Sequence, residues 1–322
     1  YAFTDDVLWW GLLSPYLASL CFSGSLVFYN SYLPEIAPAE EQDALSARGF
    51  ALGYLGSSLV LIAALAFIQN PEWIGDETAG RVTRLSFLTV GLWWLGWGEF
   101  SLFRLPSGHQ MEAPVKEKGW IRAAYMRLFE VVRTFRTMPG VERFLLGFFF
   151  ASAGVQTVIL IASLFGSKAL GLETSALITT ILLIQFVGVL GSWLFARWSA
   201  SWGNITALLV AAVVWVIICA MAYFVNTELQ FYLLGAAVGL VLGGIQSLAR
   251  STFSKLLPAE GEHVTYFSFF DIAEKLATVF GMVAVGWLET TTGDLRLAAA
   301  MLSVFFLVAA VFWNRVKMVQ KL

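Results

Sequence analysis

The stretch that decides the fold is GGIQSLARSTFSKLLPAEGEHVTYFSFFDIAEKLATVFG, from Gly243 to Gly281. In it, an apolar run ends in basic residues, the chain turns, and a second apolar run follows. When the sequence is shifted by 220 positions, residues 24–50 align with residues 244–270 at six identities, and the ends of the apolar runs coincide as well. Similarity at a fixed offset indicates an internal repeat. We infer that one span-turn-span unit occurs twice, as is typical of transporters.

The composition is far from that of a water-soluble domain. Of the 322 residues, 58% are hydrophobic and 13% are charged, and the net charge is −2, whereas charged residues make up about 25% of soluble domains. No long basic tract is present, so nucleic acid is not expected as a partner. The two cysteines and two histidines lack the spacing of a disulfide framework or a metal site. We therefore expect a protein surrounded by the lipid bilayer, without metal or cofactor, and not an enzyme.

Hydrophobic runs long enough to cross a bilayer recur along the chain. A transmembrane helix needs about 17–25 predominantly apolar residues. We predict an all-α polytopic membrane protein with nine spans, at about 8–29, 50–68, 85–103, 144–165, 175–195, 205–225, 231–248, 267–288 and 297–313. An odd number of spans places the two termini on opposite sides of the membrane.

Basic residues predict the orientation, because short loops rich in Lys and Arg stay in the cytoplasm. A cytoplasmic segment 104–143 puts fifteen of the twenty Lys and Arg residues on that side and four on the other, with Lys275 inside a span. We therefore expect a multi-pass protein with a cytoplasmic C-terminus and Tyr1 outside. The expected location is a bacterial inner membrane, and a monomer is expected.

The spans fall into two unequal groups separated by a linker. Residues 1–103 hold three spans and residues 144–322 hold six, which is one complete half in the largest class of duplicated transporters. We expect residues 1–103 to be the remainder of an N-terminal half that is truncated by three spans. In the cytoplasmic linker, residues 104–143, helical spacing of five apolar residues predicts an amphipathic helix on the membrane surface, with a regulatory or partner-binding helix as the alternative: Ile121, Tyr125, Leu128, Val132 and Phe135.

Five segments carry a family resemblance: SLVFYNSYLPEIAP (25–38), SARGFALGYLGS (46–57), RLSFLTVGLWWLGW (84–97), GGIQSLARSTFSKLLP (243–258) and FSFFDIAEKLATVFG (267–281). In these segments the chain resembles the vacuolar-effluxer-like family of the major facilitator superfamily, related to autophagy-related amino-acid exporters. The resemblance implies a major-facilitator-type helical bundle whose fourth to twelfth spans are present here, and export of amino acids. One departure is the loop at 191–204, which lacks the acid that the superfamily uses there in a gating salt bridge.

One predicted span carries charges deep in its apolar run. Polar residues recur there at spacings of three and four, which places them on one face of a helix: Ser268, Asp271, Glu274, Lys275 and Thr278. A charge at mid-membrane costs roughly 2.5–3.5 kcal/mol on insertion scales, so this face is expected to avoid lipid. Asp271, Glu274 and Lys275 are candidates for substrate binding or for coupling to a proton or another cation. The alternative is an ion pair that only stabilises the bundle.

Other candidates are amides and residues near the ends of spans. Gln156, Gln185 and Gln246 lie within spans and could bind a zwitterionic or hydroxylated solute, although hydrogen bonding between helices is the alternative. The candidates for a cytoplasmic gate are Tyr29, Asn30, Arg48 and Arg250. Arg250 is also read as an anchor whose charge reaches the membrane surface.

The favoured function is secondary active transport of a small solute by alternating access, with efflux and amino acids suggested by the resemblance. No Walker A pattern occurs in the sequence, so ATP hydrolysis by this chain is not expected. Two alternatives stay open: a transport-fold scaffold or sensor that does not transport, since fold does not fix function, and a membrane-embedded lipid enzyme. The substrate, direction of transport and coupling ion do not follow from the sequence.

Overall fold

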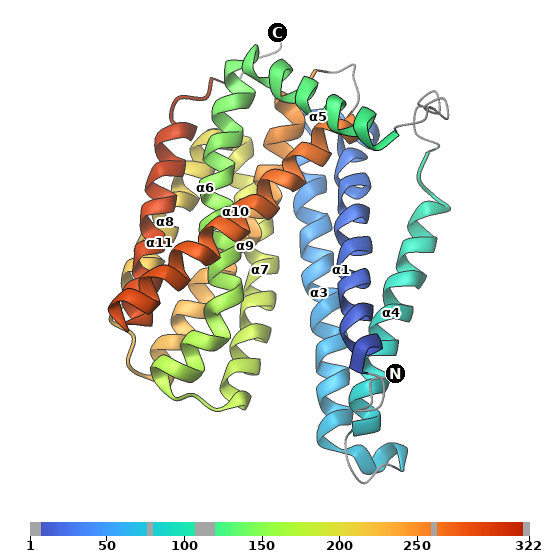
Figure 1. The fold of residues 1–322 in the computed structure, drawn as a ribbon, viewed down its shortest axis with the longest axis vertical. Helices are drawn as coiled ribbons and strands as arrows, with labels where there is room; N and C mark the ends of the chain where they lie inside the picture. The colour runs from blue at the N-terminus through green and yellow to red at the C-terminus, as the bar shows by residue number, and fades with distance from the viewer. Residues whose placement is uncertain (1–7, 76–79, 107–119, 259–262, 318–322) are drawn as a thin grey trace.

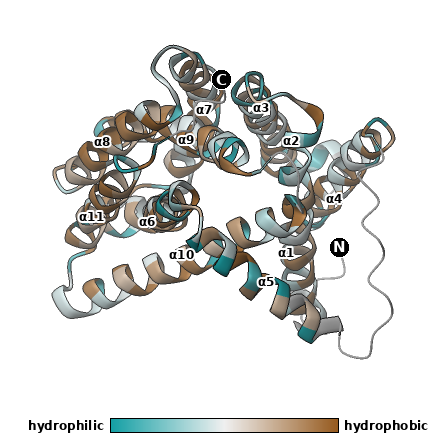
Figure 2. Ribbon diagram, turned by 90° about the horizontal axis from the view of Figure 1, so that it is seen from above, coloured by the Kyte–Doolittle hydropathy of each residue, from teal (hydrophilic) through white to brown (hydrophobic). Residues whose placement is uncertain are grey.

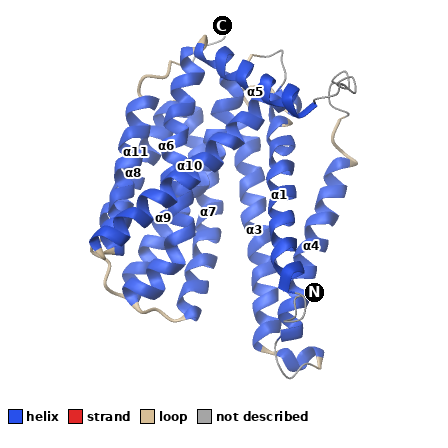
Figure 3. Cartoon of the chain, in the orientation of Figure 1, coloured by secondary structure: helices blue, strands red, loops and turns tan. Residues whose placement is uncertain are grey.

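The computed structural model of the protein describes residues 8–75, 80–106, 120–258 and 263–317. Helices make up nearly all of this part of the chain, joined by short loops and without strands (Figure 3). The elements are α1 (Leu8–Ser31), α2 (Leu33–Ile36), α3 (Gln42–Gln69), the 3-10 helix η2 (Pro71–Ile74), α4 (Gly80–Leu102), α5 (Trp120–Arg136), α6 (Pro139–Leu164), the π-helix η3 (Phe165–Ala169), α7 (Thr174–Trp202), α8 (Asn204–Ala222), α9 (Glu228–Leu256), α10 (His263–Thr292) and α11 (Leu295–Trp313).

The long helices run side by side, and α5 lies across one end of the bundle (Figure 1). We call this end the linker face. There α1, α7, α9 and α11 end, while α3, α6, α8 and α10 begin. Figure 2, a view from above, shows α1, α3 and α4 grouped on one side of the molecule and α6 to α11 on the other.

Seven helical segments of the described chain are long and apolar enough to cross a membrane: α1 with α2, α3, α6 with η3, α7, α8, α9 and α11. The protein is therefore a multi-pass integral membrane protein. The two other predicted spans coincide with α4 and α10, which have 23 and 30 residues but do not meet the same requirement of length and composition. The prediction of nine spans and that of a chain truncated by three spans both stay predictions.

Several helices extend beyond the predicted spans at the linker face. α3 begins at Gln42 although the predicted span begins at 50, and α9 continues to Leu256 beyond the predicted end at 248. The reason is that hydropathy marks the hydrocarbon region, whereas a helix continues wherever its backbone stays paired. The additional turns hold Asp43 and Lys255, which pair with each other.

Helices α7 and α9 approach each other closely along a stripe of glycines. A Cβ added to Gly239 would lie 2.5 Å from the carbonyl oxygen of Ile184, and one added to Gly243 would overlap the carbonyl of Gly188. Only glycine lets two helix backbones come this near. Gly239 and Gly243 therefore join α7 and α9 backbone to backbone, and Gly235, at the same GxxxG spacing, faces the Thr180 side chain.

Aromatic side chains fill the interior of the α6 to α11 group. Phe144 lies between Phe148, Phe253 and Trp313, and the Trp313 indole donates a hydrogen bond to the Phe144 carbonyl at 3.2 Å. Trp215 of α8 stacks on Phe306 of α11 with ring centroids 5.0 Å apart. This packing gives the group of α6 to α11 a rigid interior.

The predicted amphipathic helix corresponds to α5, which covers residues 120–136. Val131 and Phe135 are buried. The Phe135 ring packs against the rings of Phe253, Tyr266 and Phe269, with centroid distances of 6.1, 5.4 and 5.5 Å. These contacts hold α5 against α9 and α10. Residues 107–119 of the predicted linker lie outside the described residues. The division into an N-terminal remainder, a linker and a C-terminal half stays a prediction.

Candidate functional site

A cavity of about 430 Å³ lies among α3, α6, α7, α8 and α9. Most of its wall is apolar, with a few hydroxyl and amide groups, and no Asp, Glu, Lys or Arg side chain lines it. The lining residues are Tyr54, Ser57, Val158, Ile159, Ile161, Ala162, Ser163, Phe165, Thr180, Ile181, Ile184, Gln185, Ile218, Cys219, Ala222, Phe231, Leu234, Gly235, Val238, Leu242, Gln246 and Ala299. Its volume falls in the roughly 300–1,000 Å³ range of small-molecule pockets, and its mainly apolar wall is typical of them.

The cavity occupies the half of the bundle that is remote from the linker face. Its wall uses the last turns of α6 and α8 and the first turns of α7 and α9, all of which lie at the opposite end. The lining residues nearest the linker face are Tyr54 on α3 and Gln246 on α9, and the tyrosine hydroxyl donates a hydrogen bond to the Gln246 side-chain oxygen at 2.8 Å. This pair forms the floor of the cavity.

The second polar group of the wall joins α3 to α7. Ser57 and Ser58 both donate hydrogen bonds to the side-chain oxygen of Gln185, that of Ser58 at 3.3 Å. Because each glutamine accepts from α3, its NH₂ group stays available as a donor toward a bound solute. Two of the three predicted glutamines therefore line the cavity, and both contact hydroxyl groups that the sequence analysis missed.

Beyond the cavity floor, toward the linker face, Arg250 of α9 is buried with 4% of its surface exposed. Its Nε donates to Ser46 Oγ at 2.9 Å, and one terminal nitrogen donates to the Ser46 carbonyl at 3.2 Å. The other contacts Asn30 Oδ1 at 3.5 Å. The guanidinium also lies over the rings of Tyr29 and Phe50, 4.7 and 5.0 Å from their centroids, where cation–π attraction is effective. Arg250 thus connects α9 with α1 and α3.

Three of the four predicted gate residues meet in this cluster, which we call the Arg250 cluster: Tyr29, Asn30 and Arg250. Arg48 does not. It is exposed on α3, and no hydrogen bond or ion pair joins it to the cluster in the described part of the chain. The cluster instead uses Ser46, which also donates a hydrogen bond to the carbonyl of Ser247 at 2.7 Å.

A second buried network lies one turn nearer the linker face and was not predicted. Asp43 of α3 pairs with Lys255 of α9 at 2.7 Å. The same carboxylate accepts hydrogen bonds from Ser199 at 2.9 Å and from Asn204 at 2.7 Å, and the Asn204 side-chain oxygen accepts from Lys255 at 3.2 Å. We call these four residues the Asp43 network. Four helices, α3, α7, α8 and α9, meet in it.

Two members of the Asp43 network come from the segment 191–204, which was predicted as a loop but forms the last turns of α7 and the first residue of α8. Ser199 and Asn204 belong to that segment, and the carboxylate that contacts them comes from α3. A sequence signal existed, since an acid stands in the first turn of α3 and a lysine in the last turn of α9. Their separation of 212 positions hides the pairing from any local pattern.

The charged residues of α10 form a separate group away from the cavity wall. Lys275 lies 3.6 Å from Asp271 and 3.8 Å from Glu274, and the Gln156 side chain of α6 donates a hydrogen bond to Glu274 at 2.8 Å. Lys275 keeps 44% of its side chain exposed. The structure therefore brings together Gln156, Asp271, Glu274 and Lys275, and none of the four lines the cavity.

This arrangement can bind a polar group at the floor of a mainly apolar cavity, because the floor offers amide and hydroxyl groups. It can also hold the linker face closed, because two buried polar groups connect α3 with α9 there. The group on α10 can hold or release a proton, because two carboxylates share one lysine.

Comparison with known proteins finds relatives along nearly the whole chain. The family model described as "Vacuole effluxer Atg22 like" matches residues 2–321. A Bacillus subtilis protein described as an uncharacterized MFS-type transporter, YxiO, is 32% identical over 313 residues, which cover 96% of this chain and 72% of that protein. Autophagy-related protein 22 of Yarrowia lipolytica is 29% identical over 86% of this chain, and its counterpart in Saccharomyces cerevisiae S288c is 24% identical over 87%. The chain spans 51% and 61% of the lengths of these two yeast proteins.

Proposed function

Since this chain belongs to the vacuole effluxer Atg22-like family, as its resemblance predicts, we propose that it carries a small solute across the membrane as a secondary active transporter. The observation that supports this most directly is the cavity with its polar floor at Tyr54 and Gln246. A multi-pass protein with a solute-sized cavity between helices of two groups has the features that transport requires.

We propose alternating access as the mechanism, and we assign the structure to its state with the linker face closed. On that side, the Arg250 cluster and the Asp43 network connect α3 with α9. To open this face, those contacts must break while the cavity closes at the other end. We place the linker face in the cytoplasm, following the distribution of Lys and Arg.

The chemistry of the cavity favours solutes whose surface is largely apolar and whose polar groups are few. The lining side chains offer amide and hydroxyl dipoles and no full charge. An amino acid would therefore find its side chain in an apolar wall and its charged groups beside Gln185, Gln246 and Tyr54. We propose efflux of such amino acids, in line with the effluxer description of the family.

The test combines binding and transport on the full-length protein. A solute that binds the native state raises its thermal stability, so amino acids and sugars are screened by melting temperature and the hits are tested for movement in proteoliposomes. Gln246→Leu is expected to reduce uptake by roughly five- to a hundredfold, because a bound polar group would lose its partner, at a cost of roughly 1–3 kcal/mol. Gln69→Leu is the control, since Gln69 is an exposed glutamine at the far end of α3. Equal activity in both variants would contradict the proposed site.

Proton or cation coupling is assigned to the group on α10. Glu274→Gln keeps an oxygen that can accept from Gln156 and removes the titratable carboxylate. We expect this variant to retain solute binding and to lose the pH dependence of transport. Unchanged pH dependence in Glu274→Gln would assign coupling to another residue and leave solute binding in the cavity unaffected.

A further inference from the structure

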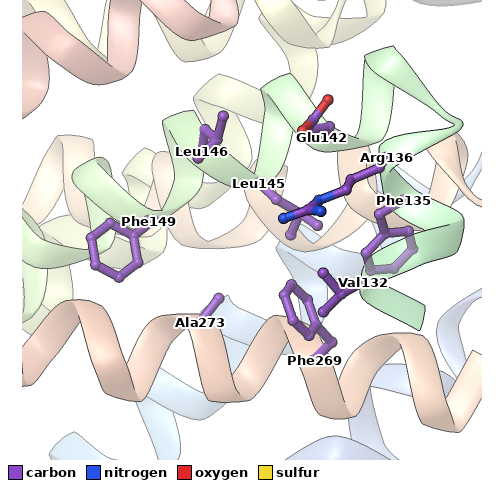
Figure 4. Close-up of a pocket in the computed structure, with 9 residues that line it drawn as sticks. All are labelled: Val132, Phe135, Arg136, Glu142, Leu145, Leu146, Phe149, Phe269 and Ala273. Atoms are coloured by element: carbon purple, nitrogen blue, oxygen red, sulfur yellow. The ribbon is translucent and has the colours of Figure 1, made fainter. Parts of the chain in front are cut away.

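A second cavity, of about 210 Å³, lies between α5, α6 and α10 at the edge of the linker face (Figure 4). It is smaller than the roughly 300–1,000 Å³ of pockets that enclose whole small molecules. It is lined by Val132, Phe135, Arg136, Glu142, Leu145, Leu146, Phe149, Phe269 and Ala273. We call it the α5 groove. Its size fits a segment of a ligand, such as part of a hydrocarbon chain.

The α5 groove is polar at one end and apolar along the rest. Glu142 lies in the first turn of α6, at the linker face, and Leu145, Leu146 and Phe149 follow at helical spacing. With a rise of 1.5 Å per residue, the α6 wall extends for about 10 Å along the helix axis. From α10, Phe269 and Ala273 continue the apolar wall in the same direction, because α10 also begins at the linker face.

Arg136 supplies the positive charge at the polar end. It is the last residue of α5 and is exposed. In Figure 4 its guanidinium extends into the groove, whereas the Glu142 carboxylate points away from it. No ion pair occupies Arg136 within the part of the chain that the structure describes. A guanidinium can bind the phosphate of a ligand through two parallel hydrogen bonds.

The surface around the α5 groove indicates contact with lipid. Tyr125, Phe129, Val132 and Arg136 follow one another along one side of α5, and Phe129 is 73% exposed. On the adjacent side of the helix, Val131 and Phe135 are buried, and Phe135 packs against α9 and α10. An amphipathic helix with exposed aromatic residues beside arginines is the pattern of a helix that lies at the membrane interface.

We propose that the α5 groove binds one anionic phospholipid, with its phosphate on Arg136 and an acyl chain between α6 and α10. Charge complementarity selects the headgroup, and the apolar wall of Leu145, Leu146 and Phe149 selects the chain. The bound lipid fills the junction between the linker helix and the larger helix group. The site is separate from the solute cavity and shares no lining residue with it.

The test uses the purified full-length protein in detergent, titrated with dioleoyl-phosphatidylglycerol or with dioleoyl-phosphatidylcholine, which has the same chains and no net charge. We expect the anionic lipid to raise the melting temperature of the wild type by several degrees. Arg136→Gln is expected to remove more than half of this shift. Arg133→Gln is the matched control, because Arg133 is an exposed arginine of the same last turn of α5 that does not line the groove.

A third variant tests the acyl chain. Leu146→Trp fills the groove from an exposed position without changing its charge, and it is expected to abolish the lipid-dependent shift. Native mass spectrometry gives an independent count of bound lipids for every variant that remains folded. Equal loss in Arg136→Gln and Arg133→Gln would mean diffuse surface attraction and would overturn the proposal. So would an equal shift with phosphatidylcholine, a full shift with glycerol 3-phosphate alone, or retention of the shift in Leu146→Trp.

Discussion

The two segments that the sequence aligns as a repeat, residues 24–50 and 244–270, carry opposite sides of one contact. The second segment supplies the cations, Arg250 and Lys255, and the first supplies Asn30, Asp43 and Ser46 as their acceptors. Asn30 and Arg250 are equivalent positions, 220 residues apart, and they touch each other. If the two segments were identical, the same side chain would stand at positions 30 and 250, and an arginine could not face an amide acceptor there. The differences between the two aligned segments therefore place donors opposite acceptors where the two helix groups meet.

The comparison extends beyond the aligned residues. At the same offset, Tyr54 of α3 corresponds to Glu274 of α10, and each contacts a glutamine: Tyr54 contacts Gln246 and Glu274 contacts Gln156. Position 54 holds a neutral hydroxyl where position 274 holds a carboxylate. Tyr54 lines the solute cavity, whereas Glu274 lies outside its wall.

The largest effect is expected from breaking the buried ion pair between the two segments. Lys255→Met leaves the Asp43 carboxylate buried without its cation, so the free energy of unfolding should fall by about 3 kcal/mol. The bonds from Ser199 and Asn204 offset part of the loss. Adding Asp43→Asn removes the stranded charge and should restore most of the stability. Thermal melts in detergent compare the stability of the single and the double variant. Unchanged stability in Lys255→Met would show that the ion pair contributes nothing.

A smaller loss is expected from the Arg250 cluster. Arg250→Gln removes two charge-assisted hydrogen bonds to Ser46 and the contacts with two rings, which should lower stability by about 2 kcal/mol. Arg48→Gln changes an exposed arginine outside the cluster and should alter stability by less than about 0.5 kcal/mol. The same melts compare the two variants. Similar losses of stability in both variants would mean that the contacts of Arg250 in the cluster do not stabilise the protein.

A gain in stability is expected when Asn30, the residue aligned with Arg250, is replaced by an acid. Asn30→Asp places a carboxylate opposite Arg250, and a hydrogen bond between charged partners is stronger than the present neutral acceptor by about 1 kcal/mol. The closed linker face should become more stable, and transport should slow because opening must break a stronger contact. Proteoliposome uptake and thermal melts report the two effects. Faster transport with unchanged stability would contradict the role of this contact as a closed gate.

The smallest effect is expected from the charged group on α10. Lys275 is 44% exposed and lies 3.6 and 3.8 Å from its two carboxylates, so Lys275→Met should cost less than about 1 kcal/mol. This is below the loss expected for Lys255→Met, whose partner is buried. The double variant Asp271→Asn, Lys275→Met should recover stability but not transport. Full transport in the double variant would make the pair only structural.

The sequence predicts the helices well because hydrophobic length is a local property. Cavity residues are predicted only in part, because Gln185 and Gln246 are conspicuous in apolar runs, whereas Tyr54 and Ser57 are ordinary residues of a membrane helix. The contact between Asp43 and Lys255 could not be predicted, since it depends on how α3 and α9 meet. The position of Arg250 near a helix end suggested a gate or an anchor, and its burial depends on Ser46 and Asn30 from the other helix group.

The glycine stripe between α7 and α9 has a mechanical consequence. Where Gly239 and Gly243 bring the two backbones into direct contact, few side chains lie between them that could change rotamer, so we expect α7 and α9 to move together as one rigid unit. We therefore expect the hinge to lie elsewhere, where the contacts are made by long side chains that can break and re-form their hydrogen bonds. The contacts of α3 with α7 and α9, at Arg250, Gln246 and Gln185, are of that kind. We therefore expect the molecule to pivot along α3, with α7 and α9 moving as a single rigid lever.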